Sequence, residues 1–219
     1  MSFVKLKASL IALLATGLGV AHAHPHLRLA YQLDPLLEQG RVTGLHVSWQ
    51  MDAQNSLLVR ENIDLNQNGV LDPDELQAFA QTNQALMSQF NYFLTLEDGA
   101  SKKPLSFETT PMTARDAGKG FQGGIYLEFT VQLKTATAST DFQMQLQDPT
   151  WYIGFEPRLG KVLASASACQ SSFTREKRLT PTQGEQEFQR IHVQCAAGSA
   201  AHPEAQLSPP KGPINGDNA

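Results

Sequence analysis

Residues 64–75 place the strongest constraint on what this chain can fold into. Oxygen-bearing side chains occupy loop positions one, three, five, nine and twelve, as Asp64, Asn66, Asn68, Asp72 and Glu75. Gly69 stands at position six, where a sharp turn needs a backbone conformation that penalises a Cβ. A calcium ion takes about six to eight oxygen ligands, and a loop with this spacing can wrap around one. The pattern predicts a calcium loop of the EF-hand type.

The flanking residues fit the same interpretation. Val70 can offer its backbone carbonyl to the ion, and Leu71 is expected to point into the core. Asp72 can cap a following helix with Pro73 in its first turn, and Glu75 completes a capping box. The predicted ligands are therefore Asp64, Asn66, Asn68, Val70, Asp72 and Glu75. The alternative is an ordinary Asp/Asn/Gly-rich turn that holds no metal.

Only three of these ligands are carboxylates, which favours a dissociation constant in the range of about 10⁻⁵–10⁻³ M. Such a site suits a structural ion outside the cytoplasm better than a switch. Helical spacing of apolar residues before and after the loop, including Leu57, Leu58 and Phe79, predicts a helix-loop-helix insertion over residues 53–90.

Strand patterns recur in the remainder of the chain up to residue 195, although residues 177–190 are polar and fit neither a helix nor a strand pattern clearly. Short segments rich in β-branched and aromatic residues alternate with Gly, Pro, Asp and Ser clusters, at 26–33, 41–51, 92–97, 104–108, 123–133, 142–147, 151–155 and 190–195. Residues 37–40 are expected to turn between the first two strands. The predicted fold class is α+β: a mostly antiparallel, sandwich-like β domain with an inserted helix-loop-helix EF-hand.

The first 23 residues have the pattern of a secretory signal peptide. Lys5 and Lys7 precede an apolar run at 10–20, and Ala21 and Ala23 form an A-x-A cleavage site. The apolar run is too short for a membrane-spanning helix, and no transmembrane segment is expected after cleavage. We therefore expect a periplasmic protein with a signal peptide at 1–23, a β domain at 24–195 carrying the insertion at 53–90, and a disordered tail at 196–219.

The two cysteines, Cys169 and Cys195, are expected to form a disulfide in an oxidising compartment. A reactive thiol pair and a metal site are weaker alternatives, because the spacing matches neither a C-x-x-C motif nor a zinc pattern. A disulfide closing this loop would stabilise the fold by roughly 3 kcal/mol.

Cleavage after Ala23 would make His24 the mature N-terminus, two residues before His26. The terminal amine and two imidazoles could together bind Ni²⁺, Co²⁺, Zn²⁺ or Cu²⁺. The alternative is a mobile terminus with two exposed histidines. His46 is expected to lie on a strand as an ordinary polar residue.

Several motifs stand out along the chain: His24-Pro25-His26, Val-Ser-Trp-Gln-Met-Asp at 47–52 followed by Ser56, the loop at 64–75, Asn91-Tyr92-Phe93, and Asp-Pro-Thr-Trp-Tyr-Ile at 148–153. Together these motifs resemble a family of exported proteins of Gram-negative bacteria, domain-of-unknown-function family 1007. The resemblance covers nearly the whole mature chain except the tail. It implies the periplasmic component of an ABC-type transport system, with a membrane permease for nickel, cobalt or zinc as partner.

No catalytic motif stands out, so we expect a non-enzymatic accessory protein rather than an enzyme. The net charge of −4, without clustered positive residues, argues against nucleic acid as a partner. Two alternatives remain open. One is an interaction module with structural calcium only, using Trp151, Tyr152 and Phe155. The other is a copper enzyme that uses the N-terminal histidine.

Overall fold

The computed structural model describes residues 27–118, 124–135, 140–150, 152–158, 162–163, 169–180 and 184–196. The chain begins there with a hairpin of β1 (Leu27–Glu38) and β2 (Arg41–Met51). Gln39 and Gly40 connect the two strands with φ values of 49° and 74°. Two consecutive positive φ values give the turn a twist that matches the flanking strands. The predicted hairpin is confirmed.

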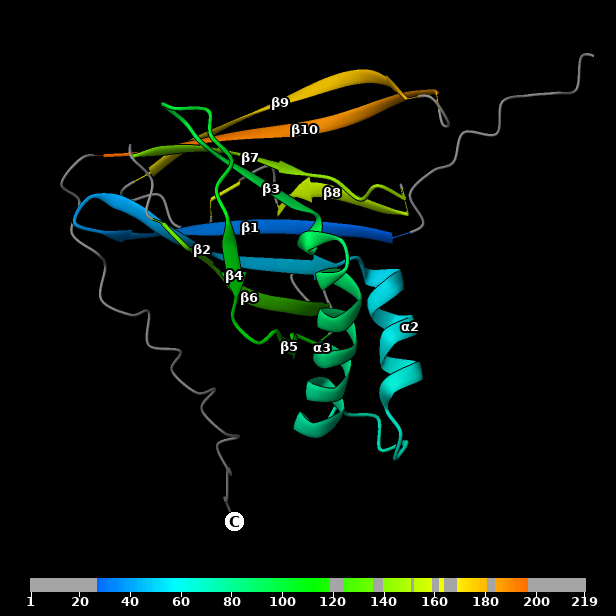
Figure 1. The fold of residues 1–219 in the computed structure, drawn as a ribbon. Helices are drawn as coiled ribbons and strands as arrows, with labels where there is room; N and C mark the ends of the chain where they lie inside the picture. Colours follow the sequence, from blue (N-terminus) through cyan, green and yellow to red (C-terminus); the bar gives the residue numbers. More distant parts are fainter. Residues whose placement is uncertain are drawn as a thin grey trace, which may run out of the picture.

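In the described residues the strands form two sheets (Figure 1). The six-stranded sheet has the order β4-β6-β2-β1-β8, with β5 also paired to β6, and the four-stranded sheet has the order β3-β7-β10-β9. The remaining strands are β3 (Leu94–Asp98), β4 (Phe107–Thr109), β5 (Thr113–Asp116), β6 (Ile125–Leu133), β7 (Asp141–Leu146), β8 (Ile153–Pro157), β9 (Cys169–Thr180) and β10 (Gly184–Cys195). The ladders between these strands are antiparallel except for the parallel pair β1 and β8.

The core lies between the inner faces of the two sheets, because alternate residues along each strand point to the same side. Trp49 on β2 is fully buried there. Its ring centroid lies 5.0 Å from that of Phe129, 5.7 Å from Phe155 and 6.4 Å from Phe93. These aromatic contacts join β2, β6 and β8 to the segment that precedes β3.

Two helices extend from the sheets, and the loop between them lies at the end of the molecule away from the sheets (Figure 1). Helix α2 (Ala53–Ile63) begins after Asp52, whose Oδ1 accepts the Asn55 amide at 2.8 Å. Helix α3 (Pro73–Ser88) begins after Asp72. It is followed by the 3₁₀ helix η1 (Asn91–Phe93).

The predicted inserted EF-hand is wrong as a description of this fold. The structure is mostly β, with two sheets and these two short helices among the described residues. Each helix is attached to the β structure and not built as a separate module: Ala80 and Met87 of α3 belong to the common core. Leu57 and Leu58 are 46% and 48% exposed, so the expected apolar face of the first helix is not buried.

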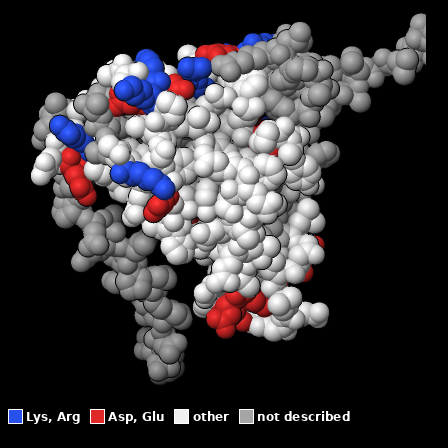
Figure 2. Space-filling view, in the orientation of Figure 1, with Lys and Arg blue, Asp and Glu red and all other residues white. Residues whose placement is uncertain are grey.

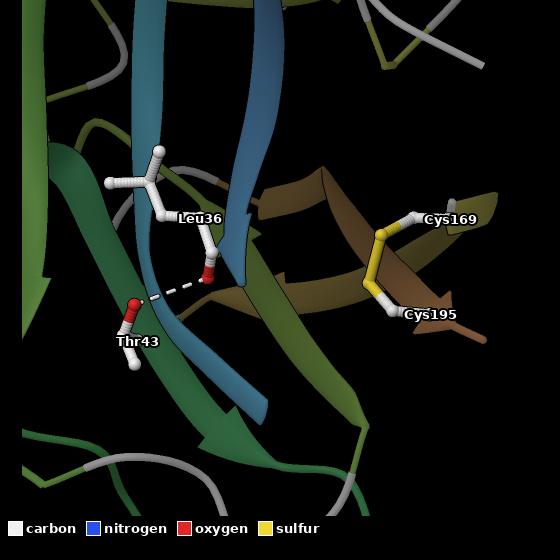
Figure 3. Close-up of a disulfide and its surroundings, with 4 residues drawn as sticks. All are labelled: Leu36, Thr43, Cys169 and Cys195. Carbon is white, nitrogen blue, oxygen red and sulfur yellow. Dashed lines mark hydrogen bonds between the residues drawn. A yellow bond between two sulfur atoms is a disulfide. The ribbon is translucent and has the colours of Figure 1, made fainter. Parts of the chain in front are cut away.

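Cys169 and Cys195 form a disulfide between directly opposite residues of β9 and β10 (Figure 3). The bond joins residues 26 apart in sequence and confirms the predicted pairing. The same view shows Thr43 of β2, whose hydroxyl donates to the Leu36 carbonyl at 3.3 Å beside an irregularity in the β1–β2 register. No helix in the described part of the chain is long and apolar enough to span a membrane.

Candidate cation-binding loop

The side chain of Asp64 organises the first half of the 64–75 loop. Its Oδ1 accepts the backbone amide of Asn68 at 3.1 Å, and its Oδ2 accepts the amide of Gly69 at 2.8 Å. Gly69 has a φ of 80°, in the left-handed region that favours glycine. The turn predicted from the glycine is therefore present in the structure.

Three more side chains meet on the same side of the turn. Asn66 Oδ1 accepts the Asn68 amide at 3.0 Å, together with the carboxylate of Asp64. Asp72 Oδ2 accepts the side-chain amides of Asn66 at 2.7 Å and of Asn68 at 3.2 Å. Residues at the first, third, fifth and ninth loop positions are thus brought together.

Glu75 accepts hydrogen bonds from backbone amides at both ends of the loop. Its Oε1 accepts the Leu65 amide at 2.8 Å, and its Oε2 accepts the Asp72 amide at 2.9 Å. The second bond is the glutamate half of a capping box at the start of α3. Glu75 is only 9% exposed, and its carboxylate joins the two ends of the loop.

Leu71 is 8% exposed and belongs to the core, as the sequence predicted. Its neighbour Val70 is 64% exposed, and Leu65 is 80% exposed. The loop is therefore fixed by one buried leucine and by its own polar side chains. Acidic side chains gather without Lys or Arg among them at the end of the molecule where α3 begins (Figure 2).

A partly buried ion pair holds the preceding helix, and sequence reasoning did not find it. Arg60 forms two hydrogen bonds to the Asp116 carboxylate, from Nε at 2.9 Å and from Nη2 at 2.6 Å. The pKa of Asp116 is lowered, chiefly by the Arg60 hydrogen bond, with burial opposing the shift. The pKa of Arg60 is raised, first by the same hydrogen bond. A cation and an anion 56 residues apart give no local sequence signal.

The fully buried Ser56 adds a second contact one turn earlier. Its hydroxyl donates to the Met51 carbonyl at 3.3 Å and accepts the Ile125 amide at 3.0 Å. Ser56 was part of the family resemblance, but its position alone did not indicate this bridging role.

The histidines considered from the sequence lie either outside the described residues or on strands away from the loop. His24 and His26 lie outside the described residues. His46 lies on β2 opposite Asp34, as an ordinary strand residue. His192 Nε2 lies 3.4 Å from Asp141 Oδ2 on the four-stranded sheet.

The three aromatic residues considered for a partner surface differ in environment. Phe155 is 7% exposed and packs in the core, whereas Tyr152 is 56% exposed. Trp151 lies outside the described residues. The part of the chain that is described therefore gives no shared aromatic surface for this trio.

The donor chemistry of the loop fits a hard divalent cation, because every side chain at the five key positions carries oxygen. Asp64, Asn66, Asn68 and Asp72 are already linked to one another. The Glu75 carboxylate accepts the backbone amides of Leu65, Asn66 and Asp72. No cluster of three or more His, Cys, Asp or Glu side chains placed to hold a metal occurs among the described residues. For Glu75 to bind an ion, its carboxylate would have to give up hydrogen bonds from these backbone amides.

The sequence matches the family model described as "Protein of unknown function (DUF1007)" over residues 9–203. It is also 26% identical over 151 residues to a protein of Haemophilus influenzae described as an uncharacterized protein. That similarity covers 66% of this chain and 68% of the relative. The family match includes the loop, both helices and all the described strands, and it confirms the resemblance at the level of the family. This chain therefore belongs to the DUF1007 family.

Proposed function

We propose that this protein is an exported, non-enzymatic accessory protein in which the 64–75 loop binds one calcium ion that stabilises the fold. The observation that carries the proposal is the meeting of Asp64, Asn66, Asn68 and Asp72 on one side of the turn at Gly69. Those side chains occupy the first, third, fifth and ninth positions of the calcium-loop pattern. Val70 and Glu75 would complete the oxygen set.

The contacts of Glu75 bear on the affinity. Its two oxygens accept the Leu65 and Asp72 amides, and a bidentate role at the ion competes with those hydrogen bonds. Two of the remaining ligands, Asn66 and Asn68, are neutral. Both features favour weak binding, with a dissociation constant in the range of about 10⁻⁵–10⁻³ M. An ion bound in this range would be held in a calcium-rich extracellular medium and would act as a structural element.

Calorimetric titration of calcium into the metal-free protein tests the proposal. We expect one site in the wild type and a loss of affinity of at least about tenfold in Glu75→Gln, because a bidentate carboxylate ligand is removed. Glu61→Gln is the matched control, since Glu61 is an exposed acid on α2 outside the loop pattern. A wild type without binding, or equal binding by wild type and Glu75→Gln, would contradict the proposal.

The wider context of the proposal is transport of a transition metal beside a membrane permease. It is supported by the family resemblance and by the pattern His24-Pro25-His26 after the expected signal peptide. The disulfide between Cys169 and Cys195 supports export, because such bonds persist in oxidising compartments. An interaction module that holds calcium alone is the second candidate, favoured by the exposed Tyr152.

N-terminal sequencing and metal analysis of protein isolated from the periplasm separate these candidates. The transport proposal predicts His24 as the first residue and nickel, cobalt, zinc or copper bound in addition to calcium. Calcium alone would support the interaction module. A first residue other than His24 would remove the proposed terminal-amine site.

A further inference from the structure

Helix α2 is held on the sheet largely by polar contacts. Its exposed leucines, Leu57 and Leu58, bury little apolar surface, and Val59 and Ile63 are only partly buried against the core. Ser56 is the buried side chain of this helix, and it is hydrogen-bonded to Met51 and Ile125. The position of the helix therefore depends on hydrogen bonds more than on apolar packing.

Arg60 provides the strongest of these contacts. Its guanidinium binds both Asp116 oxygens and also donates from Nη2 to the Gly118 carbonyl at 2.7 Å. The Gly118 amide in turn donates to Asp116 Oδ1 at 2.8 Å. The two side chains are only 17% and 21% exposed. A bidentate pair of this kind fixes direction as well as distance.

Arg60 is also hydrogen-bonded through its backbone to Asp64, the first residue of the loop. The Asp64 amide donates to the Arg60 carbonyl at 3.2 Å, at the end of α2. The Asp64 carboxylate then organises the turn through the Asn68 and Gly69 amides. The last turn of α2 thus sets the position of the first proposed ligand.

The other half of the loop is anchored separately. Asp72 and Glu75 belong to the start of α3, whose Ala80 and Met87 are buried in the core. Gln84 of α3 accepts the Met112 amide at 2.9 Å, just before β5. Each helix is therefore fixed to the β5 region by its own contact. The spacing between Asp64 and the ligands on α3 depends on both attachments.

We propose that Arg60 is a positioning residue of the 64–75 loop, which acts through Asp116 and Gly118 to hold Asp64 in place against Asp72 and Glu75. This inference rests on the proposed calcium site. Holding the ligands in place before the ion arrives reduces the ordering cost of binding. Because linkage is reciprocal, bound calcium should also strengthen the attachment of α2 to β5.

The first test is calcium affinity by calorimetry in Arg60→Gln, Asp116→Asn and the double variant. We expect each single variant to bind calcium about tenfold more weakly than wild type. The double variant should bind no more weakly than either single variant, because all three remove the same contact between Arg60 and Asp116. Arg28→Gln is the matched control: Arg28 on β1 forms an ion pair with Glu156 on β8, and the two side chains are 60% and 55% exposed. It should change the affinity less than about twofold.

The second test needs no metal. In calcium-free buffer, Arg60→Gln should speed hydrogen exchange at the Asn68 and Gly69 amides at least about fivefold, while amides of β6 and β10 exchange as in wild type. The inference is overturned by wild-type affinity in Arg60→Gln, by equal losses in Arg60→Gln and Arg28→Gln, or by faster exchange spread evenly over the whole molecule. A wild type that fails to bind calcium defeats the proposed function instead, and the exchange result then still reports whether Arg60 orders the loop.

Discussion

Ser56 is a serine with no exposed surface, and its hydroxyl joins α2 to the end of β2 and the start of β6. It satisfies the Met51 carbonyl and the Ile125 amide at once. Gly124 lies close by, and a Cβ at that glycine would meet Ser56 Oγ at 3.1 Å.

Replacement of Ser56 by alanine should therefore lower the free energy of unfolding by about 1–3 kcal/mol, because a buried backbone amide loses its partner. Urea unfolding followed by circular dichroism measures this difference. Ser88→Ala is the matched control on the exposed side of α3, and it should stay within about 0.5 kcal/mol of wild type. Equal stability of the Ser56 and Ser88 variants would show that the Ser56 hydroxyl is not structurally important.

Asp116 makes stability depend on pH through its bond to Arg60. The guanidinium holds the pKa of this carboxyl below its ordinary value. A depressed folded pKa gives stability that is present above the unfolded pKa, about 3.9, and is lost as pH falls through the folded pKa. Asp116→Asn should therefore be less stable than wild type at pH 7, with the difference narrowing toward pH 3 and below.

Urea unfolding at a series of pH values from 7 downward measures this convergence. Glu156→Gln provides the control, because its exposed ion pair with Arg28 should add little pH dependence. If the wild-type and Asp116→Asn curves ran parallel over the whole range, Asp116 would not contribute through its charge.

Residue types at special backbone positions could be predicted from the sequence. Gly69 takes the left-handed conformation that the loop pattern required, and Leu71 is buried as its position indicated. Arg60 and Asp116 could not be predicted, because their pairing depends on where α2 meets β5 in space. Of the contacts of Glu75, the bond from the Asp72 amide was predicted as part of the capping box. The bond from the Leu65 amide was not predicted, because it joins residues ten apart across the loop.

At the scale of elements, β9 is one of the two edge strands of its sheet and is paired in the described residues with β10 alone. The side chains of residues 170–175 are exposed, so this part of β9 buries little surface. The disulfide from Cys169 to Cys195 fastens the strand at the end opposite the Thr180–Gly184 pair of the ladder. The disulfide therefore stabilises β9, a strand whose described side chains are largely exposed.

Reduction of this disulfide should lower the free energy of unfolding by roughly 3 kcal/mol, from the size of the closed loop. Urea unfolding with and without a reductant measures the change, and hydrogen exchange should rise first in β9. In the double variant Cys169→Ala with Cys195→Ala, the reductant should have no further effect. A wild type equally stable in both redox states would contradict this role.

The helices illustrate why the fold class was predicted only in part. Apolar spacing at Leu57 and Leu58 suggested a buried face, but polar contacts from Ser56 and Arg60 orient α2 instead. The strands of the β1–β2 hairpin were predictable, because alternation and a two-residue turn are local signals. The parallel pairing of β1 with β8 is non-local, and strand patterns do not encode it.

At the scale of the whole molecule, the 64–75 loop lies at the far end of the helices, and Leu71 connects it to the common core. Calcium at this position would bind the folded state in preference to the unfolded chain. At a free concentration about 100 times the dissociation constant, the stabilisation would be about 2.7 kcal/mol.

Thermal unfolding at increasing calcium concentrations should therefore show a rising Tm, and removal of the ion with a chelator should reverse it. Magnesium at the same concentrations should raise the Tm less, because it demands a smaller octahedral site and dehydrates reluctantly. Glu75→Gln should show almost no calcium-dependent shift. A Tm that is independent of calcium in wild type would remove the stabilising role proposed for the ion.

The most direct test of the account is a crystal structure of the full mature protein grown in millimolar calcium, with anomalous diffraction used to identify the ion. The account predicts one anomalous peak inside the loop, with oxygens of Asp64, Asn66, Asn68, Val70, Asp72 and Glu75 at about 2.3–2.6 Å. A loop without a peak, in which Glu75 still accepts the Leu65 and Asp72 amides, would contradict the central claim.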